Sequence, residues 1–139
     1  MKALLVAALA VLVVGCGNAA SAAELGGTLK YARSGGIAGI SERATVKTDG
    51  HVTVSASKRR TRTARLTVAE RRRLSQLVRD ADLAHVKVDG KSECCDQFEY
   101  SLSYRGRTLQ WSDVDSPKSL AKLVAELNRL VAKYGGGPG

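Results

Sequence analysis

The residues of this chain whose types could do chemistry are few: it has three cysteines and two histidines. Cys94 and Cys95 are adjacent, and consecutive Cα atoms lie about 3.8 Å apart, so they can bridge one another only through a strained ring. Free thiols, a vicinal disulfide and bonds to another molecule are all open to them. His51 and His85 are far from this pair in the sequence. The sequence therefore predicts no metal site, and no motif supports a cysteine nucleophile paired with His85.

The carboxylates give no clearer sign of catalysis. Asp113 and Asp115 flank Val114 at the end of a predicted strand, and no apolar setting of the kind that paired-carboxylate chemistry needs surrounds them. Asp115 directly precedes Ser116, so helix capping explains it without chemistry. The glycine-and-lysine motif of a P-loop is also missing from the sequence. We therefore expect no catalytic residues and no cofactor, and we predict that the protein is not an enzyme.

Length and composition narrow the possible folds. The 139 residues suffice for one domain, and 22 Lys+Arg against 13 Asp+Glu give a net charge of +9 at pH 7. Hydrophobic residues make up 44% of the chain, which excludes wholesale disorder. Aromatic residues make up only 4%, so leucine, valine and alanine must build the core.

The N-terminus is typical of an export signal. A positive start is followed by an uninterrupted apolar run over residues 3–14, which is shorter than the roughly 20 residues that span a membrane. We interpret residues 1–15 as a lipoprotein-type signal peptide, because Gly15 and Cys16 follow the run as in a bacterial lipobox. Cys16 would then be lipidated and become the first residue. The alternative is ordinary cleavage near Ala22, which would discard Cys16.

Lipidation would place the protein in the cell envelope. Residues 16–24 are small and polar and suit a lipidated flexible tether, and several acyl chains anchor a protein stably to a membrane. Gly17 is not the aspartate that commonly signals inner-membrane retention. We therefore expect an exported, membrane-anchored lipoprotein, in the outer membrane if the host has one. We expect a monomer with one domain over residues 25–134, followed by a disordered tail over residues 135–139.

Hydrophobic periodicity predicts an α+β fold. Strands are expected over residues 28–33, over residues 40–47 and around Val52, and again over residues 98–104 and around Leu109. Turns are expected at the Asp-Gly pair of residues 49–50 and the Arg-Gly pair of residues 105–106.

Two amphipathic helices complete the pattern. One should begin at Thr67, which forms a capping box with Glu70, and end near residue 82. The other should begin at Ser116 as N-cap, with Pro117 in its first turn. The order β-β-β-α-β-β-α predicts an antiparallel sheet of about five strands with both helices packed on one face.

A basic stretch is one candidate binding site. Between residues 58 and 73 the only acid is Glu70, and the segment over residues 58–65 has no apolar periodicity. The stretch suits an anionic glycolipid or a cell-wall polymer, and it equally suits a solvated surface. Nucleic acid is not an expected partner, because the chain carries an export signal and has no aromatic platforms near these cations. The candidate polyanion-binding residues are Lys58, Arg59, Arg60, Arg62, Arg65, Arg71, Arg72 and Arg73.

A glycine-rich segment is the second candidate. Its six residues are Ser34, Gly35, Gly36, Ile37, Ala38 and Gly39. It can be an exposed recognition loop, in which glycines let the backbone approach another surface and Ile37 projects as one apolar anchor. It can equally be a wide strand connection with Ile37 in the core.

Two motifs together resemble the protealysin inhibitor (emfourin) family. They are the Ser-Gly-Gly-Ile-Ala-Gly sequence of residues 34–39 and the Asp-Gln-Phe-Glu-Tyr sequence of residues 96–100, followed by a strand, Pro117 and a leucine-rich final helix. The resemblance runs from about Leu29 to Leu130. Ile37 stands where the family often has Phe, and Cys95 where it often has Pro. The family consists of small bacterial inhibitors of thermolysin-type zinc metalloproteinases.

The resemblance implies a function and a site. The expected partner is a thermolysin-type metalloproteinase, which the loop over residues 34–39 would block sterically, with no metal ion held by the inhibitor itself. Such enzymes favour a large apolar side chain just after the scissile bond, a pocket that Ile37 would fill. Asp96 is expected either to contact the enzyme or to cap a turn, and Phe98 and Tyr100 are expected to be core residues. The alternative function is an envelope lipoprotein that binds polyanions through its basic stretch.

Overall fold

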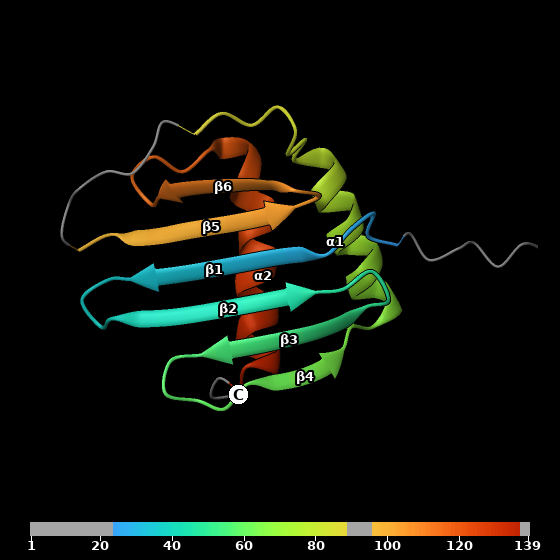
Figure 1. The fold of residues 1–139 in the computed structure, drawn as a ribbon, viewed down its shortest axis with the longest axis horizontal. Helices are drawn as coiled ribbons and strands as arrows, with labels where there is room; N and C mark the ends of the chain where they lie inside the picture. The colour runs from blue at the N-terminus through green and yellow to red at the C-terminus, as the bar shows by residue number, and fades with distance from the viewer. Residues whose placement is uncertain (1–23, 89–95, 137–139) are drawn as a thin grey trace, which may run out of the picture.

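Six antiparallel strands form one sheet in the computed structural model, which describes residues 24–88 and 96–136. The strand order across the sheet is β4-β3-β2-β1-β5-β6, so β1 lies in the middle between β2 and β5 (Figure 1). The elements are β1 (Leu29–Gly35), β2 (Ile40–Val46), β3 (His51–Ala56), β4 (Arg62–Arg65), α1 (Val68–Asp80), β5 (Phe98–Tyr104), β6 (Arg107–Ser112), the short 3₁₀ helix η1 (Lys118–Leu120) and α2 (Ala121–Tyr134). The predicted α+β class and one-sided helix layer are confirmed.

The strand that the sequence did not predict is β4, within the basic stretch. It pairs with β3, from His51 opposite Arg65 to Val54 opposite Arg62, and forms one edge of the sheet. Only Ala64 is partly buried, while the other three residues of β4 are exposed. An edge strand with one inward side chain has no apolar alternation, and cations there discourage pairing with another chain.

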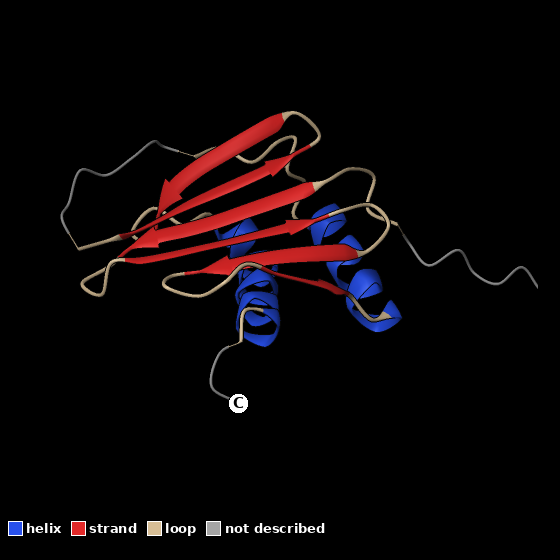
Figure 2. Cartoon of the chain, turned by 60° about the horizontal axis from the view of Figure 1, so that its bottom comes forward, coloured by secondary structure: helices blue, strands red, loops and turns tan. Residues whose placement is uncertain are grey.

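Both helices cover the same face of the sheet, and the opposite face is uncovered (Figure 2). Alternation along the strands directs apolar side chains toward the helices, as in β3, where Val52 and Val54 are fully buried. Trp111 stacks on Tyr100 with ring centroids 5.4 Å apart, and the Tyr31 hydroxyl donates to Asn128 of α2 at 2.7 Å. Every buried apolar residue of the described chain lies between Leu25 and Val131.

The predicted first helix is confirmed together with its cap. The Glu70 backbone N–H donates to the Thr67 hydroxyl at 3.1 Å, and the Thr67 N–H donates to the Glu70 carboxylate at 3.0 Å. This reciprocal pair satisfies two backbone donors that a helix start leaves free. Leu74, Val78 and Ala81 are buried in the core.

The predicted start of the last helix is wrong. Pro117, not Ser116, precedes the first turn, and no side chain caps it. Pro117 has extended backbone angles and its carbonyl accepts from the Leu120 N–H at 2.9 Å, which forms η1 before α2 begins at Ala121. Asp115 likewise caps no helix, because its carboxylate accepts from the Ser112 hydroxyl at 3.3 Å.

The predicted turns are confirmed, and the fold extends slightly past the predicted domain end. Gly50 has φ 85°, and Arg105 and Gly106 have φ 49° and 79°, the left-handed geometry of tight hairpins. Gly135, placed in the predicted tail, is buried, and its N–H donates to the Val131 carbonyl.

The predictions that involve cysteine concern residues outside the described part of the chain, namely Cys16, Cys94 and Cys95. None of the described helices has the length and apolar character to cross a membrane.

Candidate functional site

Four loops lie at one end of the sheet. Because neighbouring strands are antiparallel, β1, β3 and β6 end where β2, β4 and β5 begin, on the left in Figure 1. The β1–β2 connection, the β3–β4 connection, the approach to β5 and the segment after β6 meet at this end. We call it the loop end of the sheet. Both motifs on which the family resemblance rests lie there, although they are far apart in the sequence.

The glycine-rich segment is a tight hairpin, shorter than predicted. Ser34 and Gly35 belong to β1 and pair with Ser41 and Ile40, so the loop proper is residues 36–39. The Gly39 N–H donates to the Gly36 carbonyl at 2.9 Å and closes the turn. Ile37 is 92% exposed, so the interpretation with Ile37 in the core is wrong, while a role of the exposed loop in recognition stays a prediction.

The loop rests directly on the second motif. The Gly36 N–H donates to the Gln97 carbonyl at 3.2 Å. A Cβ atom added to Gly35 would lie 2.4 Å from that carbonyl oxygen, and one added to Gly36 would lie 2.7 Å from the Phe98 ring. Both glycines also have positive φ, at 102° and 69°. Only glycine allows this close approach, so the two motifs form one structural unit.

A charged pair braces the base of the same loop. Arg33 bonds Glu42 across the β1–β2 ladder at 2.6 Å, and its guanidinium lies 5.3 Å from the centre of the Phe98 ring. Phe98 is therefore held between Arg33 and Gly36 and is only partly buried, which differs from the predicted core position. Tyr100 packs on the core as predicted. Asp96 is exposed at the loop end, two residues before β5.

The segment after β6 carries an exposed residue that the sequence analysis did not select. Val114 is 68% exposed, between Asp113 and Asp115. The Asp113 N–H donates to the Phe98 carbonyl at 3.0 Å, and the Asp115 N–H donates to the Ser112 carbonyl at 3.2 Å. An apolar residue between two acids just after a strand was the available signal.

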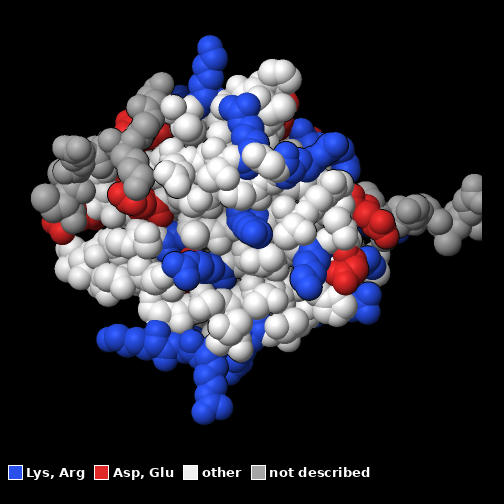
Figure 3. Space-filling view, in the orientation of Figure 1, with Lys and Arg blue, Asp and Glu red and all other residues white. Residues whose placement is uncertain are grey.

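The basic stretch is divided among several parts of the molecule. Its first three cations lie in the β3–β4 connection at the loop end, whereas Arg62 and Arg65 lie on β4 and the last three lie on α1. Arg73 is paired with Glu126 at 2.9 Å. Figure 3 shows the cations of the uncovered sheet face as separate groups among uncharged residues. The structure does not gather the eight predicted polyanion-binding residues into one patch.

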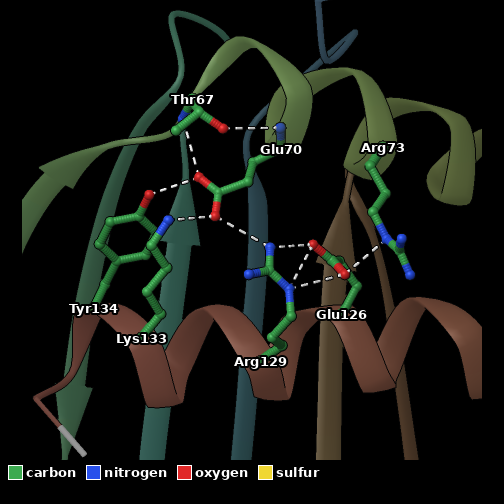
Figure 4. Close-up of polar contacts among 7 residues, drawn as sticks. All are labelled: Thr67, Glu70, Arg73, Glu126, Arg129, Lys133 and Tyr134. Carbon is green, nitrogen blue, oxygen red and sulfur yellow. Dashed lines mark hydrogen bonds and ion pairs between the residues drawn. The ribbon is translucent and has the colours of Figure 1, made fainter. Parts of the chain in front are cut away.

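Two buried carboxylates between the helices are the other charged cluster (Figure 4). Glu70 accepts from Tyr134 at 2.6 Å, Lys133 at 2.8 Å and Arg129 at 3.1 Å. Glu126 accepts from Arg129 at 2.6 Å. Each carboxylate is thus already neutralised by cations, so the cluster joins α1 to α2 and offers no free acid or base.

The hydrogen bonds control the protonation of Glu70. Burial acts to raise the pKa of Glu70, but donation from Lys133, Tyr134, the Thr67 N–H and Arg129 outweighs it and lowers the pKa from 4.5 to about 2. The capping role of Glu70 follows from the sequence, whereas its contacts with α2 do not, because they depend on how the helices pack.

Comparison with known proteins identifies the family. No curated protein matches the chain. Within residues 24–88 and 96–136, no three His, Cys, Asp or Glu side chains are grouped so as to hold a metal ion. The Emfourin family model matches residues 50–128, which include α1, the Asp96–Tyr100 motif and most of α2, and which begin after the glycine-rich hairpin. Because this match covers more than half of the 139 residues, the chain belongs to the Emfourin family.

Proposed function

We propose that this protein inhibits thermolysin-type zinc metalloproteinases and that its β1–β2 hairpin enters the protease cleft. Membership in the Emfourin family supports the inhibitor role. The observation that carries the mechanism is Ile37, an apolar side chain 92% exposed at the tip of a hairpin whose base is fixed by Gly35, Gly36 and Phe98. A preorganised loop loses little conformational entropy on binding, which favours tight inhibition.

Inhibition in this proposal is steric. Ile37 fills the apolar pocket that receives the residue after the scissile bond, and the hairpin blocks access of substrate to the zinc ion. The inhibitor contributes no metal ligand. Asp96 lies exposed beside the hairpin and is proposed to contact the enzyme at the edge of the cleft.

The test is a titration of residues 24–139 against thermolysin and a protealysin-like enzyme, followed through cleavage of a fluorogenic peptide. We expect stoichiometric loss of activity without cleavage of the inhibitor. Ile37→Asp should weaken inhibition about a hundredfold, because it places a charge in an apolar pocket. Val68→Asp is the matched control, since Val68 is 49% exposed in the first turn of α1, where a carboxylate is favourable. Full inhibition by Ile37→Asp would rule out the loop mechanism.

The alternative, polyanion binding through the basic stretch, has less support. Its eight cations are spread over a loop, β4 and α1, and Arg73 is already paired with Glu126. The dependence of binding on salt concentration distinguishes the two functions. Binding of an anionic polymer should weaken steeply as salt rises, whereas insertion of an apolar loop should change little.

We also propose that the protein is exported and anchored through Cys16. The support is the signal-like sequence before Cys16, together with the geometry of β1. β1 begins at the end of the sheet opposite the loop end, and its seven residues cover about 23 Å between the two ends. Cys16→Ser should abolish incorporation of radiolabelled palmitate and release the protein from the membrane fraction. Unchanged labelling would contradict the anchor.

A further inference from the structure

Two exposed apolar side chains share the loop end of the sheet. Among the described residues the exposed large apolar side chains are Ile37 at 92%, Val114 at 68% and Val68 at 49%. Val68 follows β4 at the opposite end of the sheet, in the first turn of α1. Isolated exposed apolar residues are common, but two on neighbouring loops form the kind of feature that marks a contact surface.

Gln97 and Phe98 hold both loops. The Gln97 carbonyl accepts from Gly36, and the Phe98 ring lies against the same glycine. The Phe98 carbonyl accepts from Asp113, the residue before Val114. The two apolar side chains therefore sit on loops fixed to consecutive residues, Gln97 just before β5 and Phe98 at its start, and their relative position is set before any partner arrives.

The turn that carries Val114 is closed on its own as well. The Asp115 N–H donates to the Ser112 carbonyl, and the Asp115 carboxylate accepts from the Ser112 hydroxyl at 3.3 Å. Pro117 follows with extended backbone angles. These constraints hold Val114 outward, although a valine of this exposure gains nothing from facing water.

The sheet gives the spacing of the two loops. The strands β1 and β6 lie on either side of β5, so their ends are two strand spacings, about 10 Å, apart. An extended peptide rises about 3.3 Å per residue, so three residues of a bound substrate cover the same distance. A substrate cleft with successive apolar pockets is therefore the kind of surface that accepts both loops together.

We infer that Val114 is a second anchor of the inhibitor and occupies a separate apolar pocket of the metalloproteinase that receives Ile37. This inference rests on the proposed function and extends it from one hairpin to two loops joined through Gln97 and Phe98. The partner is a protease whose cleft offers two separate apolar pockets. Enzymes in which one of these pockets is narrowed or charged are inhibited less than enzymes in which both pockets are open and apolar.

The experiment compares inhibition constants for five proteins spanning residues 24–139: the unchanged sequence, Val114→Ala, Val114→Asp, Ile37→Ala and the double variant with alanine at both positions. We expect each single change to weaken inhibition of thermolysin or the protealysin-like enzyme about tenfold, and the double change about a hundredfold, because the pockets are separate. Val68→Ala is the matched control and should change inhibition less than twofold. Thermal unfolding of each variant should match the unchanged protein, which excludes an indirect effect through stability.

The outcomes distinguish the inference from the function on which it rests. If Val114→Ala and Val114→Asp both inhibit like the unchanged protein while Ile37→Ala is weakened, the second anchor is refuted and the proposed function stands. If the unchanged protein inhibits neither enzyme, both are refuted. If Val114→Asp weakens inhibition at least tenfold with unfolding unchanged, the second anchor is supported.

Discussion

Replacing Glu70 with glutamine tests the carboxylate cluster that joins the two helices. Glutamine keeps the size of the side chain but loses the charge that Arg129 and Lys133 neutralise. The fall of the Glu70 pKa from 4.5 to about 2 corresponds, at about 1.4 kcal/mol per pKa unit, to roughly 3 kcal/mol of folding free energy. Arg129 and Lys133 are 46% and 45% exposed, so solvent screening reduces the expected contribution to about 2 kcal/mol.

The stability that Glu70 contributes depends on pH. The pKa of Glu70 is lower in the folded protein than in the unfolded chain, so its contribution is fully present above about pH 4.5 and is lost as the pH falls toward 2. Glu70→Gln should therefore unfold about 2 kcal/mol more easily at pH 7. The difference from the unchanged protein should shrink steadily between pH 4.5 and pH 2.

Urea unfolding at several pH values, followed by circular dichroism, measures both effects. Glu24→Gln is the matched control, because Glu24 is exposed and its hydrogen bond to the described part of the chain is made by its backbone carbonyl, which accepts from Ser75. Subtracting the unfolding free energy of each variant from that of the unchanged protein at the same pH removes the contribution of the other acids. A Glu70→Gln protein with the same pH profile as the unchanged protein would refute the reasoning.

Two further predictions concern the loop end of the sheet. In thermal unfolding, Gly35→Ala should destabilise the protein about 1–3 kcal/mol more than Gly39→Ala. Both glycines have positive φ. The new Cβ atom would meet a backbone oxygen at Gly35, whereas nothing lies within 4 Å of it at Gly39. Equal costs would show that the close approach is relieved freely. Arg60→Gln, in the β3–β4 connection, should lower the salt needed to elute the protein from a heparin column more than Arg73→Gln, since Arg73 is paired with Glu126. Equal shifts would contradict this division of the basic stretch.

Local patterns in the sequence were sufficient for most of the fold. The alternation of apolar and polar residues predicted the strands whose apolar side chains face the helices. The capping box placed the start of α1 correctly. The edge strand β4 has a single inward side chain, Ala64, so it had no pattern to detect. The start of the last helix was misplaced because proline suits both the first turn of a helix and an extended residue before it. In the folded chain Pro117 is extended, and its carbonyl accepts from the Leu120 N–H to form η1.

The candidate site was only partly accessible from the sequence. The motif predicted the position of Ile37, but whether it was exposed depended on the path of the hairpin. The contact of Gly36 with Phe98 depends on the pairing of β1 with β5, which are far apart along the chain. Val114 was missed because exposure of a single valine after a strand leaves no periodic signal. The contacts of Glu70 with α2 are likewise set by helix packing.

The hairpin separates the residues that determine its path from the residue that meets the partner. Gly35 and Gly36 fix the path through backbone contacts, and the Ile37 side chain, 92% exposed, contributes almost nothing to it. Evolution can therefore exchange residue 37 for another side chain and retarget the protein to a different enzyme without rebuilding the scaffold. The same property makes this position suitable for saturation mutagenesis, since the nineteen variants would differ in selectivity while sharing one fold.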